Sequence, residues 1–197
     1  LHTNSALGAF PRLLDIGNDK VAADGENRPK LAFGPDQRVL IAYTQPLAKP
    51  YTGDIRMLRS VDGGVTFTAP QTVHQDRQLI THRFESLAFD ASGTLHTVWI
   101  DKRDQVLAGG KGYRGAAIYR NESRDGGKSF GPDLKLADHS CECCRIALAP
   151  TPEGSIAAMW RHVFAPNIRD HAFAILGATT TAPMRASFDE WKLDACP

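Results

Sequence analysis

The chain has 197 residues, of which 42% are hydrophobic and 23% are charged, and its 23 Lys and Arg residues balance 22 Asp and Glu residues. This composition is typical of a folded globular protein and is too apolar for a disordered one. The net charge of +1 gives no indication of a nucleic-acid partner, and no apolar run approaches the roughly 18 residues that span a bilayer.

A pair of short apolar segments recurs three times along the chain. The pairs are 29–33 with 39–43, 86–89 with 95–100, and 144–150 with 156–160. Gly, Pro, Asp and Ser residues lie between the partners, and these residues favour tight turns. Each pair therefore predicts two antiparallel strands joined by a short turn.

A third apolar segment follows each pair, at 54–59, 116–120 and 171–176. The alternation has period two, which is typical of strands, and it indicates no amphipathic helix. The mixed charges at 101–104 predict a solvated loop, and 188–193 predicts the last strand of the third unit. Three repeats of about 55 to 60 residues, each an antiparallel meander, indicate the blades of a β-propeller.

Two eight-residue motifs follow the first two meanders, SVDGGVTF at 60–67 and SRDGGKSF at 123–130. In each motif the Asp side chain is expected to accept backbone N–H groups of its own turn, and the glycines permit a positive φ. The Phe is expected to pack under the sheet. The positions concerned are Ser60, Asp62, Gly64 and Phe67 in the first motif and Ser123, Asp125, Gly127 and Phe130 in the second.

The pattern S-x-D-G-G-x-[TS]-F resembles the Asp-box of the sialidase-like, or BNR-repeat, β-propellers. The resemblance covers about 28–176 and implies an all-β propeller domain over 1–197, built from four-stranded antiparallel blades. Three blades of a six-bladed ring are expected, at about 27–80, 81–140 and 141–197. We expect the other blades to come from sequence beyond Pro197 or from another chain.

The resemblance also implies where catalytic groups would lie, because sialidases place them at the starts of the innermost strands around the axis. The position of a carboxylate-binding arginine aligns with Asn27, and Arg28 falls one residue late. The acid/base position falls near Glu85, and the Glu that activates the nucleophile aligns near Cys144, with Glu142 two residues away. These departures predict degenerate sialidase chemistry.

Three further arginines are candidate ligands for an anionic or sugar group at this axial face, and the alternative is simple solvation at the surface. They are Arg83, Arg145 and Arg161. A guanidinium fork matches the geometry of a carboxylate, so arginines in this place favour an acidic ligand.

Three of the four cysteines crowd into four residues near the expected axis: Cys141, Cys143 and Cys144. One interpretation is two disulfides, one within the cluster and one to Cys196, in a secreted or periplasmic protein. The alternative is a copper or zinc site that also uses His139 or Cys196. A reactive thiol whose pKa is lowered by Arg145 is the third possibility.

The leading hypothesis is a secreted, sialidase-like propeller that binds a ligand, a metal or a protein partner at its axial face through the cysteine-rich loop. One alternative is an active exo-sialidase-type glycoside hydrolase, in which Glu85 is the acid and Arg28 binds the substrate carboxylate. A second alternative is a scaffold subunit whose partner completes the propeller. The expected partners are therefore a glycan, a small ligand or another protein, with no nucleic acid.

Overall fold

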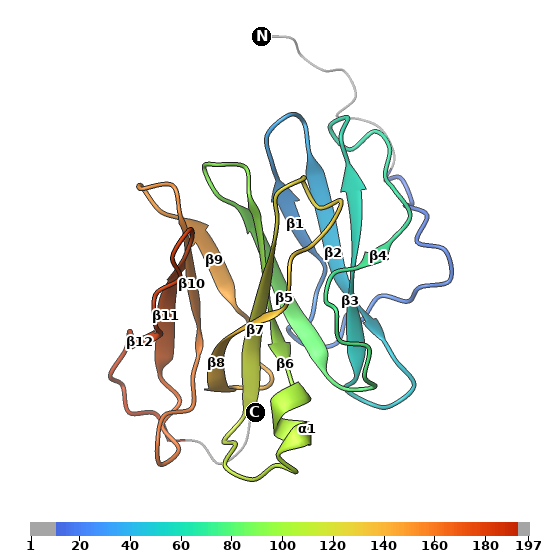
Figure 1. The fold of residues 1–197 in the computed structure, drawn as a ribbon. Coiled ribbons are helices and arrows are strands. Elements are labelled where there is room, and N and C mark those ends of the chain that lie inside the picture. The colour runs from blue at the N-terminus through green and yellow to red at the C-terminus, as the bar shows by residue number, and fades with distance from the viewer. Residues whose placement is uncertain (1–10, 193–197) are drawn as a thin grey trace.

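The computed structural model of the protein describes residues 11–192, which form three four-stranded antiparallel sheets side by side (Figure 1). In every sheet the strands pair with their neighbours in sequence, so each sheet is a simple meander. The predicted all-β class and the three repeated strand units are confirmed, whereas the number of blades in the whole protein stays a prediction.

The first sheet contains β1 (Lys30–Phe33), β2 (Val39–Pro46), β3 (Gly53–Ser60) and β4 (Gln71–Thr72). The second contains β5 (His82–Phe89), β6 (Leu95–Asp101), β7 (Ala116–Ser123) and β8 (Leu134–Ser140). The third contains β9 (Ala147–Pro150), β10 (Ile156–Arg161), β11 (His171–Leu176) and β12 (Met184–Arg185).

The position predicted for the last strand is wrong. Strand β12 pairs Met184 and Arg185 with β11, and within 188–192 the structure shows a single bridge, from Lys192 to Ile168. The connection from β11 to β12 is tight because two hydrogen bonds join Thr181 and Ile175. The Thr181 N–H donates to the Ile175 carbonyl, and the Ile175 N–H donates to the Thr181 hydroxyl. The chain therefore turns back along β11 several residues earlier than the sequence indicated.

The expected solvated loop at 101–104 is also wrong. Asp101 is fully buried at the end of β6, and the short helix α1 (Arg103–Leu107) follows it. The Asp101 carboxylate accepts hydrogen bonds from the Trp99 indole N–H at 2.8 Å and from the backbone N–H and guanidinium of Arg103. These hydrogen bonds satisfy the buried carboxylate. The prediction failed because it assumed that a charged segment is exposed to solvent.

The apolar core lies between neighbouring sheets in two layers. The layer between the first and second sheets is centred on Leu40, Met57 and Trp99, and the layer between the second and third is centred on Ile118 and Trp160. The second sheet is packed on both faces, so every residue of β6 is buried. Burying each such large side chain contributes about 1.5–3 kcal/mol, and this contribution holds the three sheets together.

The two DGG turns, residues 60–67 and 123–130, have the hydrogen bonds predicted for them. In the first, Ser60 Oγ accepts the Gly64 N–H at 2.9 Å, and Asp62 accepts the Thr66 N–H at 2.9 Å. The second repeats this arrangement with Ser123, Asp125 and Ser129. The second Gly of each turn has φ near +90°, where a Cβ is disfavoured.

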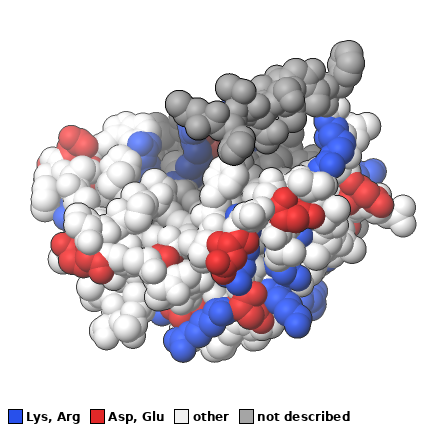
Figure 2. All heavy atoms as spheres, turned by 90° about the horizontal axis from the view of Figure 1, so that it is seen from above, with Lys and Arg blue, Asp and Glu red and all other residues white. Residues whose placement is uncertain are grey.

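Phe130 packs against the core layer between the first and second sheets, as predicted, and Phe67 is half-buried. Both DGG turns follow strand ends, after β3 and β7, at the end of the sheets drawn uppermost in Figure 1. Figure 2 views this end and shows acidic and basic side chains interspersed over its described part. Within the described residues, no helix is long and apolar enough to cross a membrane.

Candidate functional site

A cavity of about 1150 Å³ opens at the opposite end of the sheets from the DGG turns. Its walls come from the starts of β5, β7, β9 and β11 and from the ends of β6, β8 and β10. Antiparallel neighbours reverse direction, so these starts and ends meet at one edge of the sheets. Tyr51, in the β2–β3 connection, and residues 24–26 complete the lining from the first sheet.

The lining of the cavity carries an excess of positive charge. Its basic residues are Arg83, Lys102, Arg114, Arg145, Arg161 and Arg169, and its acidic residues are Asp24, Glu26 and Glu142. A concave surface with one predominant sign of charge concentrates ligands of the opposite sign. The cavity is therefore suited to an anion.

Each acidic side chain of the lining contacts a different basic one. Asp24 lies 2.5 Å from the guanidinium of Arg83, Glu26 pairs with Arg145, and Glu142 pairs with Lys102. The hydrogen bond from Arg83 lowers the pKa of Asp24, so this carboxylate stays ionised near neutral pH. These pairs leave basic groups in excess.

Arg114 and Arg161 form no ion pair with the described residues. Arg114 Nε donates to the Val163 carbonyl at 3.0 Å, and the Arg161 guanidinium lies over the Trp191 ring at 4.3 Å from its centroid. Stacking on an aromatic ring orients a guanidinium and leaves its N–H edge available for a ligand. Arg161 is thus a positioned cation at the boundary of the second and third sheets.

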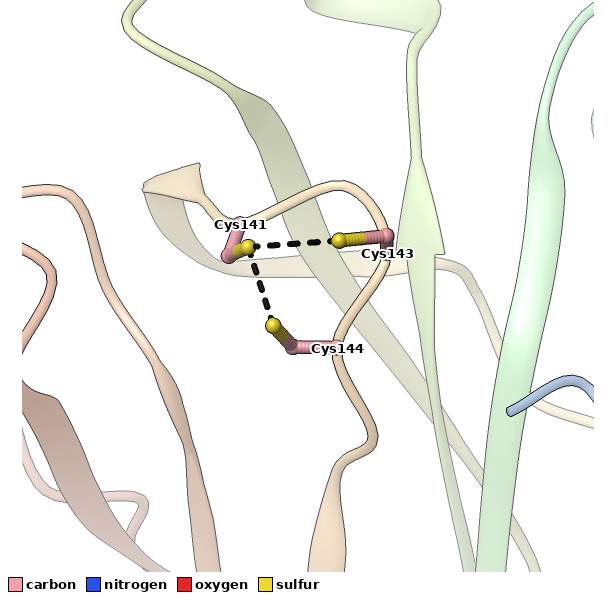
Figure 3. A group of neighbouring side chains, drawn as sticks. All are labelled: Cys141, Cys143 and Cys144. Carbon is pink, nitrogen blue, oxygen red and sulfur yellow. Dashed lines mark hydrogen bonds between the residues drawn. The ribbon is translucent and has the colours of Figure 1, made fainter. Parts of the chain in front are cut away.

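The cysteine cluster occupies the turn between β8 and β9 (Figure 3). Its three residues line the cavity. Cys141 Sγ lies 2.9 Å from Cys144 Sγ and 3.8 Å from Cys143 Sγ. Cys141 is buried and the other two are half-buried. Arg169 Nη1 approaches Cys141 Sγ at 3.5 Å, so a guanidinium faces the cluster.

The two closest thiols have unequal acidity. The hydrogen bond from the Cys144 thiol, together with the Arg169 guanidinium, lowers the pKa of Cys141 to about 6. Donating that hydrogen bond raises the pKa of Cys144. The shared hydrogen bond therefore favours ionisation of Cys141 over ionisation of Cys144.

The cluster matches its predictions only in part. No bond joins two of the three described sulfurs, so the predicted bridge within the cluster is not confirmed, and Cys196 lies outside the described residues. His139 does not join the group of sulfur atoms that lie within 4.8 Å of one another. Its Nδ1 accepts the Arg114 N–H at 3.3 Å, and its ring packs against Tyr113 and His162.

Glu85 and Asn27 lie close together but do not line the cavity. Each is about 1% exposed, and the Thr44 hydroxyl lies between them, donating to Glu85 Oε2 at 2.8 Å and lying 3.1 Å from Asn27 Oδ1. Burial raises the pKa of Glu85 to about 7. A bulge in β5, with Phe84 at φ 57°, sets the direction of this carboxyl.

The other predicted residues divide between the cavity and the surface. Arg83, Arg145 and Arg161 line the same cavity as the cysteines, whereas Arg28 is exposed and does not line it. Sequence reasoning did not select Lys102, Arg114 or Arg169, although each stands next to a strand end, which is the signal that could have found them. No residue was predicted to stack on Arg161, because Trp191 is distant from it in sequence.

A second group of potential ligands, Asp54, His74 and His82, lies between the first two sheets. His74 Nε2 accepts the Ile55 N–H at 3.1 Å, and Nδ1 lies 2.7 Å from the Asp76 carbonyl. Both ring nitrogens are therefore used, and burial lowers the pKa of His74 to about 3. This hydrogen bonding is that of a structural histidine and offers a metal no lone pair.

No protein-family model and no curated protein sequence matches this chain. Solved structures do share its fold. A Hadza microbial sialidase has a TM-score of 0.58 at 14% identity, covering 77% of this chain and 36% of its own. A Penicillium chrysogenum α-L-arabinanase complexed with arabinobiose has a TM-score of 0.55 at 14% identity, and the match covers 86% of this chain and 54% of the arabinanase. A Dyadobacter fermentans protein of unknown function has a TM-score of 0.53 at 17% identity, and the match covers 86% of this chain and 58% of that protein.

At these identities the similarity concerns the fold alone. The chain spans between 36% and 58% of the length of these three proteins. The resemblance to sialidase-like propellers therefore holds at the level of the fold, with four-stranded antiparallel sheets and propeller glycoside hydrolases among the structural neighbours.

Proposed function

We propose that the chain belongs to a secreted, six-bladed, sialidase-like propeller that binds a negatively charged saccharide in the axial cavity. The observation that carries the proposal is the lining of this cavity, in which six basic side chains meet three acidic ones. Charge of this sign selects an anion, and arginine in particular fits a carboxylate or sulfate through paired N–H donors.

The rest of the lining suits the ring of a sugar. Tyr51 is exposed and contributes aromatic surface to the cavity, and sugar sites combine apolar surface with a few oriented polar groups. Arg161, stacked on Trp191, is the best positioned carboxylate ligand, and Arg83 is held in place by Asp24. The structural neighbours named as a sialidase and an arabinanase support a carbohydrate over other anions.

We propose binding without the standard sialidase reaction. A general acid must reach the glycosidic oxygen, and Glu85 is about 1% exposed and hydrogen-bonded to Thr44. A second candidate function, glycoside hydrolysis with Glu85 as the acid, is favoured by the pKa of about 7 of this carboxyl. That function requires the β5 bulge to open toward the cavity.

The test is calorimetric titration of the full chain with acidic oligosaccharides, such as sialyl and uronyl trisaccharides, and with their carboxyl-reduced counterparts. We expect binding of the acidic forms alone, weakened at least tenfold by Arg161→Gln and by Arg83→Gln. The control is Arg28→Gln, because Arg28 is exposed outside the cavity. Equal binding of both forms, or an equal loss in the control variant, would contradict the proposal.

The same samples separate the two candidate functions. After overnight incubation, chromatography of the oligosaccharides should show no cleavage if the cavity only binds. Cleavage that Glu85→Gln abolishes would instead establish the hydrolase and leave the role of the arginines intact.

A further inference from the structure

We propose that Cys141 and Cys144 form a Cu(I) site on the wall of the cavity. The proposal is independent of saccharide binding, since it rests on the cysteine cluster and its charged surroundings. Both cysteines lie on one tight turn between β8 and β9, so the local fold brings their sulfurs together.

The geometry places a donor pair at the surface of an open space. The two Sγ atoms lie 2.9 Å apart, and the sulfurs of the three clustered cysteines all lie within 4.8 Å of one another. Metal–sulfur bonds are about 2.3 Å long, so the pair must separate to admit an ion. Cys144 is half-buried on the cavity wall and has the room to move outward.

The donor set favours Cu(I) over Zn(II). Within residues 11–192, this group contains sulfur atoms only, since no imidazole or carboxylate lies with them. Structural zinc sites are almost always tetrahedral with four ligands, which is more than this group supplies. Soft thiolate ligands are suited to Cu(I) without any nitrogen or oxygen ligand. Cys143 is disulfide-bonded and supplies no thiolate, so we assign two ligands, Cys141 and Cys144, and not three.

The charge around the pair also matches Cu(I). Binding follows the balance Cu⁺ + 2 RSH → [Cu(SR)₂]⁻ + 2 H⁺, in which copper stays in the +1 state and no oxidant is needed. The product is an anion, and Arg169 Nη1 already lies 3.5 Å from Cys141 Sγ. Arg145 follows Cys144 in the chain and lines the same cavity. A zinc dithiolate is neutral and would gain less from these cations.

The backbone holds Cys141 in place for this role. Its N–H donates to the Arg161 carbonyl at 2.9 Å, which joins the end of β8 to the end of β10. The first ligand is therefore fixed across two sheets, and the second, Cys144, lies further along the same turn. An ion bound there would couple the second and third sheets at the cavity.

The experiment is a titration of the full chain with Cu(I), under anaerobic conditions with a non-thiol reductant, in competition with a colorimetric Cu(I) chelator. We expect one Cu(I) per chain, with a thiolate-to-copper absorption band in the ultraviolet. Cys141→Ser and Cys144→Ser should each weaken binding at least a hundredfold, while the matched control Cys143→Ser should bind as the wild type does. Zn(II) should compete poorly.

Several results would overturn this assignment. One is a Cys144→Ser variant that binds Cu(I) as tightly as the wild type, and another is an equal loss in Cys143→Ser. A third is a Cys141–Cys144 disulfide that persists in the reductant, which a mass 2 Da below the dithiol value would reveal. Thermal unfolding of each apo variant shows whether a lost site reflects lost folding, and none of these readings depends on a saccharide.

Discussion

Glu85 makes the stability of the protein depend on pH. Its burial raises the pKa to about 7 from 4.5, against smaller opposite effects from the Thr44 hydroxyl, Lys30 and Arg83. Between these two pH values the folded protein binds more protons than the unfolded chain, so stability falls as pH rises and levels off above about pH 7. We expect a loss of about 3 kcal/mol across this window, absent in Glu85→Gln.

The measurement is urea unfolding of the wild type and of Glu85→Gln at intervals from pH 4 to 8. Taking the difference between the two proteins removes the contributions of the titratable groups that both of them contain. Glu153→Gln is the control, because Glu153 is exposed. A wild-type minus Glu85→Gln difference that stays constant with pH would show that this carboxyl is not the source.

The place of Glu85 could be predicted from the sequence, but its environment could not. The strand at 86–89 was evident from its alternation, yet the bulge between Arg83 and Ser86 shifts the register just before it. A shift of one residue turns a side chain to the other face of a sheet. Nothing in the local sequence marks Phe84 as a residue of positive φ, since Gly and Asn are the usual signals.

Among the elements, the pairing of β7 with β8 supports the cavity most directly. Gly115 stands at the start of β7, and a Cβ there would lie 2.0 Å from the carbonyl oxygen of Ser140. Gly115→Ala must therefore push β8 away, and the displacement reaches Cys141, the next residue. We expect a loss of stability of about 2 kcal/mol or more, and weaker Cu(I) binding.

Gly131→Ala is the matched control for this change, because its Cβ would meet nothing closer than 3.6 Å. Chemical unfolding of both variants should leave the control within about 0.5 kcal/mol of the wild type. Similar losses in the two variants would mean that the close approach to Ser140 carries no energetic weight.

Elements were predictable where pattern and turn chemistry agreed. The first three strands of each sheet follow from period-two alternation, and the DGG turns follow from residues that bond within their own loop. Helix α1 was missed because it has five residues and buries none of them, so it leaves no helical periodicity. The same polar segment was interpreted as a loop, although Asp101 within it is buried.

At the scale of the whole molecule, the repeat predicted the three sheets, but the convergence of their ends was beyond the sequence. Cys141 and Arg161 meet because β8 and β10 end side by side, and Arg83 enters the same cavity from β5. This proximity depends on how neighbouring sheets pack, and therefore on core side chains far from the site. The cationic character of the cavity is thus a property of the assembly of sheets.

Arg103 links the connection that follows the first sheet to the second sheet, and its loss is the strongest test of that assembly. Its guanidinium lies 2.7 Å from Asp101, 2.9 Å from Asp133 and 3.4 Å from Asp76. All three Asp side chains are at most 7% exposed. Arg103→Gln would leave these buried carboxylates without their cation, and we expect a loss of about 3–5 kcal/mol.

Protonation removes the charge of the buried carboxylates that have lost their cation. The loss of stability in Arg103→Gln should therefore become smaller as pH falls below about 5. The control is Arg124→Gln, since the Arg124 side chain is 84% exposed and lies 3.9 Å from Glu122. A pair of that kind contributes about 0–1 kcal/mol. The measurement is urea unfolding of both variants at pH 7 and pH 4. An equal loss of stability in the two variants would show that the sheets are held together by their apolar layers alone. A loss of stability in Arg103→Gln that is the same at both pH values would show the same.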